Sequence, residues 1–119
     1  MARTREKRKA SRIEPFVVPC RVLHKMRRLA GHLVDLSVRG TRLASEEVLP
    51  KTGSRIVIEA KLGASVAMRL NGEVKWVRKI GRPLAGQMAG ITFRGMTEKQ
   101  QHAVEFALYE FRRRAAALT

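Results

Sequence analysis

The sequence predicts a mostly β fold, a small antiparallel β-barrel followed by one C-terminal α-helix. Short aliphatic and β-branched runs are separated by turn residues at spacings of roughly 8 to 12 residues, as in small barrels rather than parallel βαβ units. Alternation is clearest from Val66 to Trp76, where apolar residues or glycine occupy every second position. Residues 97–117 then have the apolar spacing of a helix. The 119 residues suit one domain with its own core.

Each expected strand is a run of residues that suits a pleated, half-buried surface. The expected strands cover residues 16–24, 29–36, 39–44, 55–60, 66–76 and 88–93. Pro19 predicts a sheet edge or a bulge in the first run, because proline cannot donate a hydrogen bond to a neighbouring strand. Residues 25–28 are expected to form a basic turn. Gly72 is expected to bend the fifth strand or to split it in two.

A capping motif marks the start of the helix. Thr97 and Gln100 have the Ser/Thr-x-x-Glu/Gln spacing of a capping box, in which each side chain satisfies a backbone N–H that the first helical turn leaves without a partner. Apolar residues then recur at helical spacing and make one stripe. This stripe consists of Val104, Ala107, Leu108, Phe111 and Ala115. We therefore expect the helix to pack on the strands.

The composition is strongly basic. A net charge of +15, from 25 Lys and Arg against 10 Asp and Glu, predicts attraction to an anion such as nucleic acid, a nucleotide or an anionic membrane surface. Cys20 is the only cysteine, so the chain has neither an internal disulfide nor a thiolate cluster for a metal. No apolar run approaches the roughly 20 residues of a membrane span, and the N-terminus lacks the apolar stretch of a signal peptide. We expect no membrane insertion and a cytoplasmic location.

The positive charge begins in an N-terminal arm. Residues 1–12 carry six Lys or Arg against the single acid Glu6, with few apolar side chains to bury. Such a segment is expected to be flexible until a partner orders it. The sequence therefore predicts a basic arm over residues 1–14, a β-barrel over 15–95 and the packed helix over 97–117.

The stretch Asp35-Leu36-Ser37-Val38-Arg39-Gly40 places polar groups inside a strand-like run. One interpretation is a turn between two strands, since Asp, Ser and Gly are common turn residues. The other is a ligand site. An ionised Asp35 accepts hydrogen bonds only, and so complements the N1 and N2 donors of guanine. Ser37 can donate to a phosphate, and Gly40 permits a close approach of the main chain.

Arg8 and Arg12 could supply the other half of such a site. They are four residues apart in the arm, and a guanidinium can bind a phosphate or the O6 and N7 edge of guanine with two hydrogen bonds. Together with Asp35 and Ser37, they would contact a guanine nucleotide from both edges while neutralising its phosphates.

At these residues the chain resembles the PilZ domains, receptors for the bacterial second messenger cyclic di-GMP. The signature of that family is an Arg-x-x-x-Arg pair followed by Asp/Asn-x-Ser-x-x-Gly. Here the pair is Arg8 with Arg12, and Asp35 follows after 22 residues. Residues 72–76 and 89–93 are similar to the family's closing strands. The resemblance implies a six-stranded antiparallel split barrel with an appended helix, and an arginine arm that folds over the mouth of the barrel to trap the dinucleotide.

The resemblance also implies a function. The chain would be a receptor without enzymatic activity or cofactor that binds cyclic di-GMP and signals through an unidentified protein partner. The implied ligand-binding residues are Arg8, Arg12, Asp35, Ser37 and Gly40. Lys7 precedes the arginine pair, and a basic residue there can favour a stacked ligand dimer in this family. A monomer and a ligand-mediated dimer are therefore both open.

Other interpretations are weighed against this one. Trp76 lies on the predicted inward stripe, which favours core packing, and the alternative is a role in stacking near a base. The sequence offers no nucleophile paired with a base, which disfavours an enzyme. Its histidines do not have the spacing of metal ligands, which disfavours a metal site. The alternative function is a small basic barrel that binds RNA or DNA through phosphates. Aromatic residues are only 5% of the chain, which disfavours a surface for base stacking.

Overall fold

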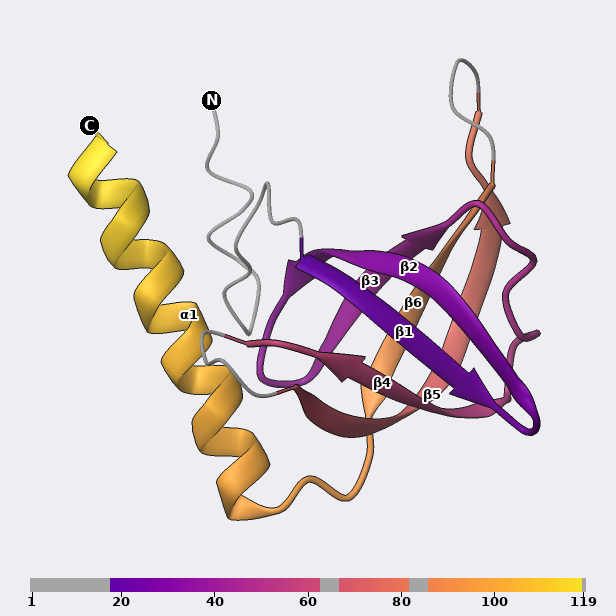
Figure 1. The fold of residues 1–119 in the computed structure, drawn as a ribbon, viewed down its shortest axis with the longest axis horizontal. Helices are drawn as coiled ribbons and strands as arrows, with labels where there is room; N and C mark the ends of the chain where they lie inside the picture. The colour runs from indigo at the N-terminus through magenta and orange to yellow at the C-terminus, as the bar shows by residue number, and fades with distance from the viewer. Residues whose placement is uncertain (1–17, 63–66, 82–85, 119) are drawn as a thin grey trace.

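Six antiparallel strands and one helix make up the part of the chain that the computed structural model describes, residues 18–62, 67–81 and 86–118 (Figure 1). The strands close into a six-stranded antiparallel barrel, as predicted, and their order is β1-β2-β3-β6-β5-β4. The elements are β1 Val18–His24, β2 Arg27–Leu36, β3 Gly40–Ser45, β4 Arg55–Ala60, β5 Met68–Lys79, β6 Gln87–Phe93 and α1 Glu98–Leu118. Residues 1–17 lie outside this description, so the division of the chain at residue 14 stays a prediction.

The interior of the barrel is filled by aliphatic side chains from every strand. Alternate residues of each strand point inward, so the core is a set of cross-strand pairs such as Leu33 with Leu43 and Ile58 with Leu70. The largest fully buried apolar side chains are Leu33, Leu36, Leu43, Ile58, Leu70, Val22, Val74 and Val104. The barrel is therefore a packed core without a ligand channel.

The basic turn is shorter than expected, and of the two outcomes expected at Gly72 the structure shows the bend and not the split. The basic turn comprises only Lys25 and Met26, and Arg27 and Arg28 already belong to β2. A tight two-residue connection is possible because Lys25 adopts the left-handed conformation, with φ of 57°. The fifth strand does not split at Gly72. It pairs with β4 over residues 68–73 and with β6 from residue 72 onward, so one continuous strand bends between two neighbours.

The helix begins with the predicted capping box. The backbone N–H of Thr97 donates to Oε1 of Gln100 at 2.8 Å, and the N–H of Gln100 donates to Oγ1 of Thr97 at 3.1 Å. The Gln100 amide also donates to the carbonyl of Arg69 at 2.7 Å, which ties the start of the helix to β5.

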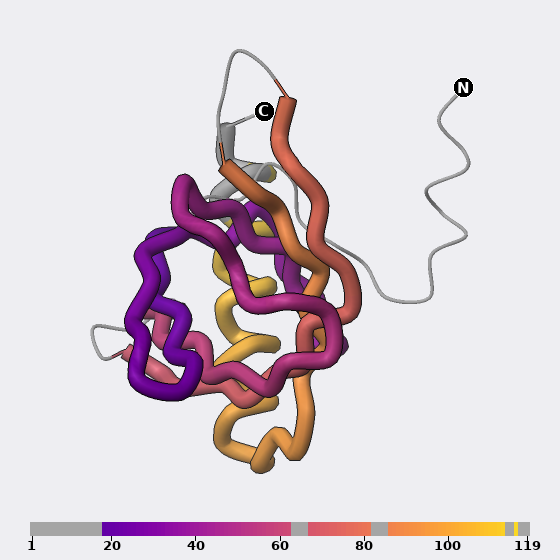
Figure 2. The backbone as a smooth tube through the Cα atoms, turned by 90° about the vertical axis from the view of Figure 1, so that its right-hand side faces the viewer, coloured from indigo at the N-terminus to yellow at the C-terminus, as the bar shows by residue number. Residues whose placement is uncertain are grey.

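The apolar stripe of the helix packs on one end of the barrel. Val104, Ala107 and Leu108 are buried in the core, and Phe111 is half-buried against it, as predicted. The side chain of Ala115 lies outside the described side chains. Figure 2 views the barrel from the opposite end, and α1 crosses behind the ring of strands. Within the described residues, no helix is long and apolar enough to cross a membrane.

Replacing Gln100 with Ala should lower the free energy of unfolding by about 1–2 kcal/mol, because it removes half of the capping box and the contact with Arg69. Urea denaturation followed by circular dichroism measures this loss. Gln101→Ala is the matched control, since its exposed side chain lies on the next helical position. Equal losses in the two variants would contradict a special role of the cap.

Cys20 should react slowly in the native protein. Burial raises the pKa of its thiol to about 12, because the thiolate is disfavoured in apolar surroundings. Since iodoacetamide reacts with the thiolate, labelling near pH 8 should proceed far more slowly in buffer than in denaturant. Mass spectrometry reports the extent directly, as this is the only cysteine. Rapid labelling of the folded protein would contradict the closed barrel.

Candidate ligand-binding site

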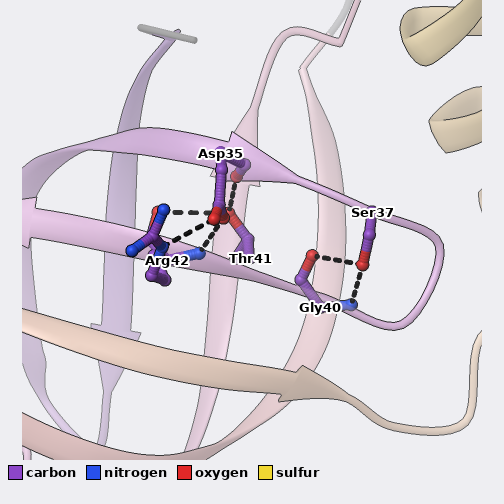
Figure 3. A network of polar contacts seen from close by, with 5 residues as sticks. All are labelled: Asp35, Ser37, Gly40, Thr41 and Arg42. Atoms are coloured by element: carbon purple, nitrogen blue, oxygen red, sulfur yellow. Dashed lines mark hydrogen bonds and ion pairs between the residues drawn. The ribbon is translucent and has the colours of Figure 1, made fainter. Parts of the chain in front are cut away.

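The stretch from Asp35 to Gly40 forms the tight connection between β2 and β3. The Ser37 hydroxyl accepts hydrogen bonds from the N–H groups of Arg39 and Gly40 at 3.2 and 3.3 Å, and donates to the carbonyl of Gly40 at 3.4 Å (Figure 3). The Ser37 N–H donates to the same carbonyl at 2.9 Å. Ser37 is 1% exposed. The turn interpretation is therefore confirmed as the local geometry, with the hydroxyl inside the turn.

Gly40 allows two strands to come together. A Cβ atom at this position would overlap the backbone oxygen of Ile91 in the neighbouring strand β6. Any side chain would therefore push β3 away from β6 and disturb their pairing. This packing requires glycine whether or not a ligand is bound.

Asp35 pairs with an arginine that the sequence analysis did not single out. Its Oδ1 accepts a hydrogen bond from the backbone N–H of Arg42 at 2.7 Å, and its Oδ2 accepts one from Nε of Arg42 at 2.6 Å. The Thr41 hydroxyl donates to the backbone carbonyl of Asp35 at 2.6 Å. The Asp35 side chain is 0% exposed, whereas that of Arg42 is 38% exposed. Figure 3 shows the two side chains pointing toward each other.

A bulge in β2 brings this pair together. Leu33 pairs with Leu43 and Asp35 with Arg42, so β2 contains one residue more than β3 between these pairs. The extra residue places Asp35 on the same face as Arg42, on the outer wall of the barrel. Sequence pattern alone does not indicate this bulge, so the register that assigns Arg42 to Asp35 could not be predicted.

Trp76 also lies on the outer wall, and the prediction that it points inward is wrong. A second register shift, between Val74 and Trp76, adds Lys75 to β5 and reverses the alternation beyond it. Trp76 is half-buried and pairs with Gly90 across to β6. The guanidinium carbon of Arg78 lies 4.4 Å from the centre of the indole ring, a cation–π contact. A base that stacked on this face of the ring would have to displace Arg78.

The two bulges produce one row of residues across four strands. Asp35, Arg42, Gly90 and Trp76 are successive cross-strand partners on β2, β3, β6 and β5. A hollow of about 240 Å³ lies beside this row, lined by Thr41, Arg42, Lys75, Trp76, Gly90, Ile91 and Thr92. Its charged lining residues are both cationic, so an anionic group would be favoured there. We call this surface the outer-wall site.

The implied position of the arm over the mouth of the barrel is not tested by the described residues. The helix α1 covers the end of the barrel next to residues 36–40 (Figures 1 and 2). Asp35 and Arg42 instead lie on the wall. Arg8, Arg12 and Lys7 lie outside the described residues, so their place in the site stays a prediction. Among the described residues, no group of His, Cys, Asp or Glu has an arrangement that could hold a metal ion.

Replacing Gly90 with Ala should disturb the row. The added Cβ would overlap the indole of Trp76, so the ring must move, and overpacking of this kind costs about 1–3 kcal/mol. Because Trp76 is the only tryptophan, its fluorescence spectrum reports the movement directly. Gly81→Ala is the control, since nothing lies within 4 Å of a Cβ at that position. An unchanged spectrum in Gly90→Ala would show that the indole does not rest on Gly90.

Comparisons with known proteins agree with the fold and with the resemblance to PilZ domains. No curated protein sequence matches the chain. The PilZ domain of YcgR from Escherichia coli, solved with c-di-GMP, is 18% identical, with a TM-score of 0.75 over 92% of this chain and 94% of that one. The c-di-GMP complex of MrkH from K. pneumonia is 17% identical, with a TM-score of 0.77 over 95% of this chain.

A third solved structure, also a PilZ domain, is similar to this chain. The PilZ domain of CeSA from a cellulose-synthesizing bacterium is 16% identical, with a TM-score of 0.62 over 86% of this chain and 98% of that one. The chain spans only 56% of the MrkH chain but nearly the whole of the two isolated PilZ domains. The profile of the PilZ domain matches residues 6–110, most of the sequence, and on this ground the chain is a member of the PilZ domain family.

Proposed function

We propose that this chain is a non-enzymatic receptor that binds cyclic di-GMP at the outer-wall site and passes the signal to a protein partner. The observation that carries the proposal is the Asp35–Arg42 pair beside the cationic hollow, at the position of the family motif. Structures of YcgR and MrkH, which share this fold, hold c-di-GMP. The ligand is a dianion with two guanines, and both of these features suit the residues at the site.

The phosphates are assigned to the cationic side of the site. Arg42 and Lys75 line the hollow, and Arg78 lies beside it on Trp76. Guanidinium groups bind phosphate oxygens with charge-assisted hydrogen bonds, which are stronger than neutral ones. Asp35 fixes the direction of the Arg42 side chain through Nε, and this orientation lowers the entropy that Arg42 loses when it binds an anion.

The guanine base is assigned to Asp35. An ionised carboxylate accepts hydrogen bonds only, and so complements the N1 and N2 donors of guanine. Since Asp35 is 0% exposed, the side chains that cover it, Arg42 among them, must move when the base arrives. Ser37 and Gly40 support this arrangement through the turn that ends β2.

The arm supplies the remaining contacts in this proposal. Arg8 and Arg12 would close over the ligand from outside, and the binding free energy would offset the cost of ordering the segment. The cytoplasmic location belongs to the same proposal, because a second messenger made inside the cell is read there. Lys7 would decide between one ligand and a stacked pair, so the stoichiometry of binding tests its role.

Calorimetric titration with cyclic di-GMP tests the proposal. The unmodified protein should bind, and Arg12→Ala should weaken binding by about 1–3 kcal/mol, because a charge-assisted contact is lost. Arg5→Ala is the matched control, since it removes an equal charge from the same arm outside the motif. Equal affinities of the Arg12→Ala and Arg5→Ala proteins would refute the role of the arginine pair.

The same titration separates the two classes of function. If the unmodified protein gives no heat with cyclic di-GMP but binds a short oligonucleotide with an affinity that falls steeply with salt, the nucleic-acid alternative is correct. Binding of cyclic di-GMP with a weak dependence on salt supports the receptor.

A further inference from the structure

A second cationic surface lies on the part of the barrel away from the outer-wall site. Two adjoining hollows of about 580 and 670 Å³ share Lys25 and Arg55. They are lined by residues of the β1–β2 turn, the segment before β4, the bend of β5 and the end of β6. We call this surface the basic groove and define it by Leu23, Lys25, Arg27, Lys51, Arg55 and Arg94.

The charge of the basic groove is of one sign. None of the residues that line the two hollows is acidic, although five are Lys or Arg. Arg94 pairs with Glu73 at 3.4 Å, whereas within the described residues Lys25, Lys51 and Arg55 make no ion pair. Elsewhere on the barrel, the exposed Arg69 is paired with Glu59. Glu73 pairs with Arg94 and is the cross-strand neighbour of Arg55, but the remaining cations around the groove raise the local potential and favour an anionic partner.

The groove also presents aliphatic surface. Leu23 and Val57 are half-buried in its wall, and Met26, at the tip of the adjoining turn, is 98% exposed. A side chain of this size exposed beside a groove is typical of a contact surface between proteins, where Met and Arg are enriched. By contrast, no Phe, Tyr or Trp lines the two hollows, so a strand of nucleic acid would find no ring for its bases.

The groove and the outer-wall site lie mainly on different walls, although both reach β5 and β6. In the closed order β1-β2-β3-β6-β5-β4, the strands β3 and β6 lie across the barrel from β4 and β1. Arg42 and Gly90 are on the first two strands, whereas Leu23, Arg55 and Val57 are on or beside the other two. The two surfaces share no lining residue, and Glu73, which pairs with both Lys75 and Arg94, lies between them.

We propose that the basic groove is the docking surface for an acidic protein segment that carries aliphatic side chains. Acidic groups of the partner would pair with Lys25, Arg55 and their neighbours, while aliphatic groups would pack on Leu23 and Val57. The inference rests on the proposed function, since it names where the receptor meets its protein partner and what chemistry that partner must have.

Selection from a random peptide library displayed on phage tests this docking surface. The immobilised wild-type protein is the target, and the double variant Lys25→Glu, Arg55→Glu is used for counter-selection. Lys61→Glu, Lys99→Glu is the matched control, since it changes the charge equally at exposed positions outside both hollows. Circular dichroism confirms that each double variant is folded, and Lys25→Gln, Arg55→Gln replaces the charge reversal if it is not.

The inference expects selected peptides that are rich in Asp or Glu and in Leu, Ile or Val. Their affinity should fall by about tenfold or more in the groove variant and stay near wild type in the control. The inference is overturned if no groove-dependent peptide emerges, if the selected peptides lack acids, or if a short oligodeoxynucleotide binds the groove more tightly than they do.

Titration of the same variants with cyclic di-GMP keeps the two proposals separate. The groove variant should bind cyclic di-GMP like the wild-type protein, because its substitutions lie outside the outer-wall site. If the wild-type protein does not bind cyclic di-GMP, only the receptor function is refuted. A groove variant that loses both ligand and peptide would refute the separation of the two surfaces.

Discussion

The pairing of Asp35 with Arg42 is the interaction on which the site depends. A buried carboxylate without partners is unfavourable by several kcal/mol, and Arg42 compensates the burial of Asp35 by supplying both a backbone N–H and Nε. The same pair fixes the register of β2 against β3 next to the turn. Fold and site are therefore coupled here, because Asp35, the residue proposed to bind guanine, also fixes the pairing of β2 with β3.

The bulges on β2 and β5 explain why the site lies on the outer wall. Each adds one residue, and each thereby turns a functional side chain, Asp35 or Trp76, to the face that carries Arg42 and Gly90. The indole of Trp76 fits against Gly90 because glycine has no side chain, and Arg78 makes a cation–π contact with the indole. Without either bulge, a polar or large aromatic group would point into an interior already filled by aliphatic side chains.

The sequence allowed correct prediction where local chemistry decides the structure. Thr97 and Gln100 lie within one helical turn, so their capping box does not depend on distant residues, and the alternation from Met68 to Val74 correctly indicated a half-buried strand. Prediction failed at Trp76, because alternation continues only until an extra residue interrupts it. Arg42 was missed for a related reason, since its partner Asp35, seven residues away in the chain, is set by the bulge between Leu33 and Asp35. Long-range register, rather than residue preference, limited the prediction of the site.

Part of the excess positive charge lies at the outer-wall site and part lies in the basic groove. A ligand with two negative charges cannot require all of a net charge of +15, and mutual repulsion among unpaired cations opposes folding. At the outer-wall site that repulsion is partly compensated, because Asp35 and Glu73 lie among the cations. In the basic groove Glu73 pairs with Arg94 and lies opposite Arg55 on the neighbouring strand, whereas Lys25 and Lys51 make no ion pair within the described residues, so an acidic partner would relieve repulsion there. Under the two proposals, a signal passes from one surface to the other only if ligand binding changes the basic groove.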